Sequence, residues 1–452
     1  MAGTTRDRDI REVSSAGLLA SQIASSGSTE PSTGRKPGLR NNPKYAAWFE
    51  RAAFYFSFLS AAAIVLSIAA SQIFLGAAIL SLLASRKRLR YPPLILPLCL
   101  FFIGTVIAAL LSGDPPSGLP QLRKFYVSLI AIVVFNTFHT LKQISYLVLT
   151  WGAAGLLSAL DSLLQFYHRY QQAHLLNAND YGFYLDGRIM GFAGHWMTFG
   201  GEEMIVLLLL LSFLLFAPAR RSKWAVAAGA SLIWVSIILG LTRSIFLLGV
   251  PVGVTYLLWN WKKWSLAALA IMAALSFTIA PIQVRERVVS VFHPHVPLDS
   301  NRQRVTTRRT GWRMVEAHPW FGLGPEQVGK QFLRYLPPDV SLPLPKGYYG
   351  HLHNIYLQYA AERGIPTMLM MMWLIVKSLW DFRRPLNSSL ANTDIKYILH
   401  GAIAVMLALL AEGFFEYNLG DSEILTMFFV VAACGYIAVE NIASTPQTGY
   451  KK

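Results

Sequence analysis

Long apolar runs separated by short polar segments dominate this chain. Residues 52–85 carry no charge, and since one membrane span needs only about 20 residues, we expect two helices there. Ten further runs lie near residues 94–112, 125–139, 144–165, 196–217, 224–241, 244–260, 264–281, 364–380, 396–413 and 423–440. The pattern predicts an all-α membrane protein with about 12 transmembrane helices.

The charges of the connecting segments alternate along these predicted spans. With the N-terminus inside, the segments expected in the cytoplasm are all basic, as in 86–90, 220–223 and 262–263. This agrees with the positive-inside rule. The loops expected on the opposite side include residues 166–195 and a long loop over 282–352.

Five segments follow from this topology. Residues 1–45 are rich in Ser, Gly and Thr with mixed charge, so we expect a disordered cytoplasmic tail. The other four are transmembrane helices 1–9 over 46–281, a partly helical, arginine-rich periplasmic loop over 282–352, a short periplasmic helix with transmembrane helices 10–12 over 353–442, and a cytoplasmic tail over 443–452.

The composition supports a membrane protein. Hydrophobic residues make up 54% of the chain and charged residues 14%, outside the usual balance of a soluble protein. The net charge of +16 would suggest nucleic acid in a soluble chain, but basic residues of membrane proteins collect in cytoplasmic loops and at anionic headgroups. We therefore expect contact with membrane lipids and no nucleic-acid partner.

The loop over 282–352 is basic although it is expected in the periplasm, where loops usually carry few basic residues. It holds eight arginines and two lysines, and long loops translocate regardless of charge. Guanidinium groups are planar and always charged, which suits bidentate binding of phosphate. The alternative is a solvated, salt-bridged amphipathic loop.

His353 is the candidate for chemistry. We expect it to begin a short helix at the external interface, interrupted by Gly364 and Pro366 before the membrane run. At a helix N-terminus the macrodipole disfavours imidazolium, and free backbone N–H groups face any phosphate brought alongside. This arrangement suits a general base next to an anionic leaving group, although a structural interfacial histidine explains the same local residues.

Other chemistries find less support. His351 and His353 are possible metal ligands, but neither a Glu at metalloprotease spacing nor a cysteine accompanies them, so we predict no metal site. Arg243 lies in a tight turn between two apolar runs, where a charge is costly. It is either a functional residue or an arginine that extends to the membrane surface.

The string from His351 to Gln358 resembles the signature of the O-antigen ligase and O-antigen polymerase family, which reads HN, nine residues, then G-x-x-G. His353-Asn354 and Gly364 fit this pattern, whereas Thr367 replaces the second glycine.

Other segments are similar to the same family, and the resemblance covers roughly residues 180–440. Arg308 with Trp312 is similar to the family's R-x-x-x-W, and residues 318–324 to its P-x-x-G-x-G segment. Arg243 fits the arginine before the family's central helix, and residues 188–201 are similar to a stretch of some members.

The resemblance implies a GT-C-like glycosyltransferase that needs no metal and no cofactor. Its donor would be a polyprenyl-diphosphate-linked glycan, used at the periplasmic face of the inner membrane. The implied catalytic residue is His353, and the implied diphosphate- or substrate-binding residues are Arg243, Arg308, Arg309, Arg188, Asn354 and His351.

The sequence does not determine which molecule accepts the saccharide. Transfer to a lipid A-core glycolipid is favoured over transfer to a growing glycan polymer or to a protein hydroxyl. A flippase for the same lipid would predict repeated halves, and the sequence shows no convincing internal repeat. A receptor or scaffold would explain the long loop but not its arginine bias.

Overall fold

The computed structural model describes residues 43–177, 181–218, 223–293, 301–344, 350–387 and 392–443. These residues form helices and connecting turns with no strand among them, which confirms the all-α class. The chain divides into two units, Met1–Ala46 and Ala47–Lys452, and of the first only the beginning of helix α2 is described. The tails predicted over 1–45 and 443–452 lie almost entirely outside the described residues.

Each predicted apolar run coincides with helical structure. The helices are α2 (Pro43–Ala63), α3 (Ile68–Ala84), α4 (Ile95–Leu111), α5 (Leu119–Lys124) continued by η3 (Phe125–Ser128) and α6 (Leu129–Thr137), α7 (Leu141–Leu175), α9 (Trp196–Phe216), α10 (Lys223–Leu239), η4 (Ile245–Gly249) with α11 (Val250–Trp261), α12 (Ser265–Ile279), α16 (Ile355–Arg383), α17 (Thr393–Glu412) and α18 (Ser422–Ala443).

Only some of these helices are long and apolar enough to cross a membrane. Within the described ranges, 6 helices are long and apolar enough to cross a membrane, or up to 7 if α12 and α13 (Ile282–Val289), bent by 118°, form one span. The protein is thus a multi-pass membrane protein. The count of twelve crossings is not confirmed and stays a prediction.

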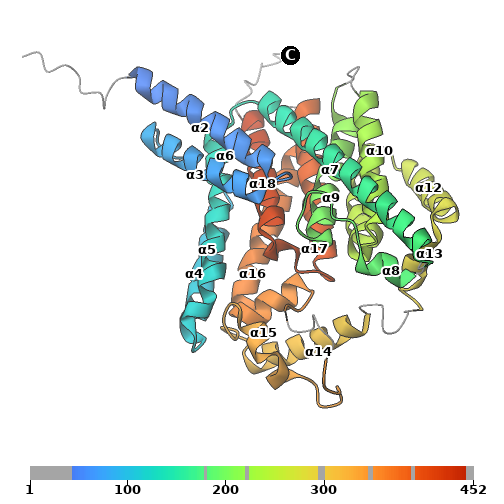
Figure 1. The fold of residues 1–452 in the computed structure, drawn as a ribbon. Coiled ribbons are helices and arrows are strands. Elements are labelled where there is room, and N and C mark those ends of the chain that lie inside the picture. The colour runs from blue at the N-terminus through green and yellow to red at the C-terminus, as the bar shows by residue number, and fades with distance from the viewer. Residues whose placement is uncertain are drawn as a thin grey trace, which may run out of the picture. The chain divides into compact units, whose positions relative to one another are not determined.

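Helix α9 lies at the centre of the second unit. It is apolar on every side apart from the buried Glu202 and Glu203 near its beginning, which suits a helix surrounded by other helices, and it packs against α7, α10, α11 and α17 (Figure 1). Helices α17 and α18 pack against each other beside it. By contrast, α3 and α4 expose large apolar side chains, which suits contact with lipid.

Helix α16 is broken at Gly364, as predicted, where φ is 81°. Residues 319–324, the strap, pair with the backbone at this break: the Leu323 N–H donates to the Ala361 carbonyl at 2.8 Å, and the Ile365 N–H donates to the Pro319 carbonyl at 2.8 Å. A Cβ atom on Gly364 would lie 2.1 Å from the Trp320 carbonyl oxygen. Only glycine fits there, because its φ is positive and the strap leaves no room for a side chain.

The described part of the segment 282–352 has its own small hydrophobic core. Met314, Val328 and Phe332 pack with Leu352 and Leu357 at the start of α16. In Figure 1, α14 and α15 of this segment lie below α16. These helices, together with the remaining short elements, are α8 (Tyr181–Asp186), η2 (Pro115–Gly118), α14 (Asn301–Ala317), α15 (Gln327–Gln331), η5 (Phe332–Tyr335), η6 (Arg384–Asn387) and η7 (Asn418–Gly420).

Candidate functional site

Asn354 fixes the start of α16 against the loop that follows α17. Its side-chain oxygen accepts a hydrogen bond from the Leu357 N–H at 2.8 Å and so caps the helix, a position where asparagine is preferred. Its side-chain nitrogen donates to the Phe414 carbonyl at 3.0 Å. One residue therefore both starts the helix and ties it to the loop that carries Glu416.

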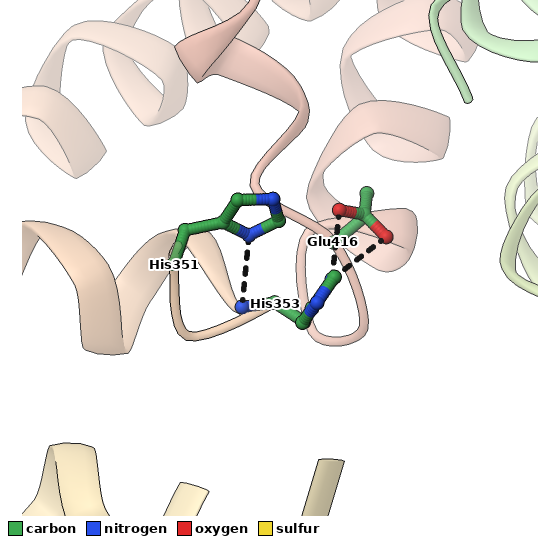
Figure 2. Close-up of side chains that lie close together, drawn as sticks. All are labelled: His351, His353 and Glu416. Carbon is green, nitrogen blue, oxygen red and sulfur yellow. Dashed lines mark hydrogen bonds and ion pairs between the residues drawn. The ribbon is translucent and has the colours of Figure 1, made fainter. Parts of the chain in front are cut away.

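His353 precedes this cap and faces Glu416. Its φ of 49° lies in the left-handed region, which histidine adopts more readily than most residues. The Nδ1 atom lies 3.2 Å and 3.4 Å from the two carboxylate oxygens of Glu416 (Figure 2). With Nδ1–H donating to the carboxylate, Nε2 is left to accept a proton.

Glu416 is buried, with 4% of its surface exposed. Burial raises the pKa of its carboxyl, but the hydrogen bond from His353 and the charge of Arg304 are among the contacts that outweigh burial and hold the pKa below its usual value. The carboxylate is therefore ionised at neutral pH and is able to orient the imidazole.

His351 supports the loop from the other side. Its Nδ1 atom accepts a hydrogen bond from the His353 backbone N–H at 3.4 Å, and the two rings lie 4.1 Å apart (Figure 2). Burial lowers the pKa of His351 to about 4, so this ring is neutral at neutral pH. The structure thus places His351 behind His353, within contact of its backbone.

Arg304 and Arg188 lie near the His353–Glu416 pair, and Arg287 lies near these two arginines. The Nη2 atom of Arg304 lies 3.8 Å from Glu416. Burial, followed by the charges of Arg287 and Arg304, lowers the pKa of Arg188 to about 9, and burial also lowers the pKa of Arg304. The guanidinium groups of Arg188 and Arg304 therefore form a positive cluster beside one carboxylate, which favours binding of a multiply charged anion.

The buried side chain of Arg243 makes hydrogen bonds within the protein. Its Nη1 atom donates to the carbonyl and the hydroxyl of Ser290 at 3.1 Å and 3.0 Å, and its Nη2 atom donates to the Asn301 side chain at 2.6 Å. These bonds join the end of α13 to the beginning of α14. A role for Arg243 in binding diphosphate stays a prediction.

The two neighbouring arginines of α14 point to different partners. Arg308 is exposed, lies 6.0 Å from the ring of Phe415, and follows Arg304 by one helical turn. Arg309 makes two hydrogen bonds of 2.7 Å to Asp339 in an exposed ion pair. The face of α14 that meets the Glu416 loop therefore carries Arg304 and Arg308, and Arg309 lies on another face.

The expectation of free backbone N–H groups at the start of α16 is wrong for two of them. The Ile355 N–H donates to the Gly413 carbonyl at 2.8 Å, and the Leu357 N–H donates to the Asn354 side chain. The loop after α17 occupies the position where a phosphate was expected. Anion binding at this site depends on arginine side chains instead.

The same residues have the composition of a metal site. His351, His353 and Glu416 each offer one ligand atom, and these atoms lie within 4.8 Å of one another. Two histidines and a carboxylate are a ligand set that zinc accepts. The positive charges of Arg188, Arg287 and Arg304 oppose a dication there, and the prediction that the enzyme needs no metal stays a prediction.

Residues 206–372 match a family model described as O-Antigen ligase. This segment is similar to O-antigen ligases and makes up 167 of the 452 residues. It extends from α9 into α16 and contains Arg243, Arg304 and His353, while Arg188 and Glu416 lie on either side of it. The match confirms the family indicated by the His-Asn motif, whose members are ligases of the glycosyltransferase kind. A comparison with curated proteins found no match.

Four site residues were missed from the sequence: Glu416, Arg304, Arg287 and His195. His195 caps α9 by accepting the Met197 N–H at 3.2 Å, and burial, then the charge of Arg188, lowers its pKa. A usable signal existed for Arg304, since it precedes Arg308 by four positions and so shares its helix face. For Glu416 the signal was weaker: a carboxylate in a short loop between two apolar runs.

Proposed function

We propose that this protein is an O-antigen ligase-like glycosyltransferase, which moves a saccharide from a polyprenyl-diphosphate donor to a hydroxyl of a lipid A-core acceptor. The reaction would take place at the periplasmic face of the bacterial inner membrane. The observation that carries the proposal is the His353–Glu416 pair beside Arg304 and Arg188. A proton acceptor and an anion-binding site lie side by side.

In the proposed step, His353 Nε2 removes the proton of the acceptor hydroxyl, and the oxygen forms a bond to the anomeric carbon of the donor sugar. The bond from that carbon to the phosphate oxygen breaks, and the diphosphate leaves with the electron pair. Glu416 stabilises the imidazolium that forms, as the carboxylate does in hydrolase triads. Attack opposite the leaving group inverts the anomeric carbon.

The arginines would stabilise the charge that develops on the leaving diphosphate. The Nε atom of Arg304 is buried and has no hydrogen-bond partner among the described residues, so it is available to a phosphate oxygen. Arg308 and Arg243 are further candidates. Because fixed cations supply the neutralising charge, the proposed reaction needs no metal and no cofactor.

The proposed topology places the site outside the cytoplasm. With about 12 crossings and a cytoplasmic N-terminus, the segment 282–352 and the loop with Glu416 lie in the periplasm. Six to seven spans meet the requirements of length and composition, and the shorter apolar helices, such as α3 and α4, would supply others. Cysteine labelling from the periplasmic side at the exposed positions Ser341 and Arg88, in a Cys99→Ser background, tests this, with reaction expected at Ser341→Cys alone.

The test of the function is His353→Ala. We expect this variant to insert in the membrane, bind the donor lipid and transfer no glycan. His168→Ala, an exposed histidine on α7, is the matched control and should transfer normally. Normal transfer by the His353 variant would exclude the proposed mechanism.

The acceptor distinguishes the proposal from its alternatives. Mass spectrometry of surface glycolipids and glycoproteins from a strain without the protein should show lipid A-core that lacks long chains. Shortened chains would instead favour a polymerase, and loss of glycoprotein would favour a protein O-oligosaccharyltransferase. Directional lipid transport without transfer would favour a flippase.

A further inference from the structure

The strap, residues 319–324, carries two large aromatic side chains that are exposed. Trp320 is 70% exposed and Phe321 is 51% exposed, whereas Leu323 is buried. Single apolar side chains are common on protein surfaces, but adjacent large ones are typical of a contact surface. The described residues of the chain leave this aromatic pair uncovered.

The backbone of the strap directs these two side chains outward. The Gly324 N–H donates to the Glu362 carbonyl at 2.9 Å. A Cβ atom on Gly322 would lie 2.3 Å from the carbonyl carbon of Glu362, so the strap lies directly on the backbone of α16. Because this contact leaves no room for side chains between the two segments, Trp320 and Phe321 extend away from α16.

The strap lies at one end of two apolar helices that pack against each other, α4 and α16. A Cβ atom on Gly324 would lie 2.2 Å from the Cβ atom of Ser112, the residue that follows α4. The Ile365 N–H, just after the break in α16, donates to the Pro319 carbonyl at 2.8 Å. The strap therefore covers the end of α4 and the break in α16 together.

Each of these two helices carries a stripe of exposed apolar side chains that reaches the strap. Members of a stripe are three or four positions apart, so they share one helix face. The stripe on α16 consists of Ile365, Leu369, Trp373, Val376 and Trp380. The stripe on α4 consists of Leu96, Leu100, Ile103, Ile107 and Leu110. Exposed apolar stripes on the helices of a membrane protein suit contact with lipid.

The apolar part of α16 beyond the strap has the length of one membrane crossing. From Ile365 to the exposed Arg383 in the last turn the helix rises about 27 Å, and the hydrocarbon core of a bilayer is roughly 30 Å thick. Trp320 at one end and Trp380 near the other correspond to the two aromatic belts of a membrane protein. The candidate span Ile355–Asn387, with 33 residues, is longer than one crossing needs.

We propose that the strap is a membrane-interface anchor, which inserts Trp320 and Phe321 between the headgroups and the acyl chains of a phospholipid bilayer. An indole suits this boundary, because its ring is apolar and its N–H still reaches water. The strap is continuous with two stripes that extend over the thickness of a bilayer, so lipid and not a second copy of the chain covers it. The proposal does not depend on the reaction of the site.

The anchor fixes the height at which α16 leaves the bilayer, since the strap is hydrogen-bonded to α16 at its break. The crossing then begins at Ile365, and residues 355–363 lie outside the hydrocarbon core. The buried ion pair of Glu362 and Arg363, 3.0 Å apart, is thus placed at the headgroups, where charges are less costly. The beginning of α16 with His353 is held on the water side of the boundary.

The first test measures the depth of single positions of the full-length protein in vesicles of phosphatidylethanolamine and phosphatidylglycerol. In a Cys99→Ser background, in which the remaining Cys434 is buried, Trp320→Cys and Phe321→Cys are spin-labelled. Collisions of each label with oxygen, which concentrates in lipid, are compared with collisions with a water-soluble nickel chelate. We expect a several-fold lower nickel collision rate at both positions than at Trp312→Cys.

Trp312→Cys is the matched control. Trp312 on α14 is 59% exposed, but its neighbours one helical turn away are the exposed Arg308 and Glu316, so water surrounds it. Ile103→Cys, on the stripe of α4, provides the value for a position in lipid. Equal nickel collision rates at Trp320→Cys and Trp312→Cys would exclude the anchor. Spin–spin broadening at Trp320→Cys at a high ratio of lipid to protein would show that a second copy covers the strap, which also excludes it.

The second test needs no added cysteine. Phospholipids with bromine atoms near the carbonyl end of their acyl chains quench tryptophans at the headgroup boundary. Since the chain has 12 tryptophans, Trp320→Phe is compared with Trp312→Phe. We expect Trp320→Phe to lose part of this quenching and Trp312→Phe to retain all of it. Equal quenching of the two variants would overturn the proposal, whatever is found for glycan transfer.

Discussion

The Nδ1 atom of His353 lies 3.2 Å from Oε1 of Glu416, although the two residues are separated by 63 positions in the chain. Asn354 makes this contact possible, because it caps α16 and bonds to the carbonyl of Phe414 in the loop that carries Glu416. The orientation of the base by the carboxylate thus depends on one asparagine. The predictions below start from this pair.

Replacing Glu416 tests whether it orients His353. Glu416→Gln removes the charge but keeps the size, so the imidazolium formed in the reaction loses its partner. We expect kcat to fall by about 10²–10⁴-fold with little change in KM, as for loss of general-base function. Steady-state kinetics with a defined donor and acceptor measure both values.

Glu416→Asp is the control for that prediction. It keeps the negative charge and should recover part of the lost kcat. A purely structural role predicts a different result, with Glu416→Gln unfolding at a lower temperature and kcat per folded molecule unchanged.

Arg304 is expected to stabilise the leaving diphosphate. Its guanidinium lies beside Glu416, and its Nε atom has no partner among the described residues. Arg304→Ala should lower kcat by about 10²–10³-fold, the usual effect of removing one group that stabilises transition-state charge. Arg304→Lys should retain more activity than Arg304→Ala, because it keeps the charge without the planar geometry.

Arg334→Ala is a suitable control, since the exposed Arg334 lies 5.9 Å from the ring of Tyr335, away from the His353–Glu416 pair. It should leave kcat unchanged. A larger loss for Arg309→Ala than for Arg304→Ala would instead favour the loop arginine that the sequence suggested.

The neutral state of His351 predicts a pH dependence of stability. Burial lowers its pKa from 6.5 to about 4 in the folded protein. Between these values the unfolded chain binds a proton that the folded chain does not, so stability falls as the pH is lowered from about 6.5 toward 4. The melting temperature in detergent, followed by tryptophan fluorescence, should therefore be lower at acid pH than at neutral pH.

His351→Asn should reduce this difference, because asparagine does not titrate. His168→Asn, which changes an exposed histidine, should leave the difference as it is. If both variants keep the full pH dependence, the acid sensitivity belongs to other groups.

The sequence predicted the helices and the break in α16 because their signals are local. An apolar run of sufficient length requires a helix in a bilayer, and Gly364 with Pro366 interrupts a helix wherever it packs. The pairing of His353 with Glu416 depends on a contact between distant segments and left no local pattern. Similarly, Arg304 and Arg309 belong to one arginine-rich stretch, and only the packing of α14 shows which of them meets Glu416.

The replacement of the family's second glycine by Thr367 has a structural counterpart in α4. A Cβ atom on Gly104 would lie 2.4 Å from the Thr367 Oγ1 atom, so the small residue that allows close approach of the two helices is on α4. Gly104→Ala should destabilise the protein by about 1–3 kcal/mol, as overpacking does. Adding Thr367→Gly should restore part of the lost stability, measured as melting temperature in a double-mutant cycle.

Gly76→Ala is the control, because nothing lies within 4 Å of the added Cβ and alanine favours the helix. Additive effects of Gly104→Ala and Thr367→Gly would show that the two positions do not compensate each other.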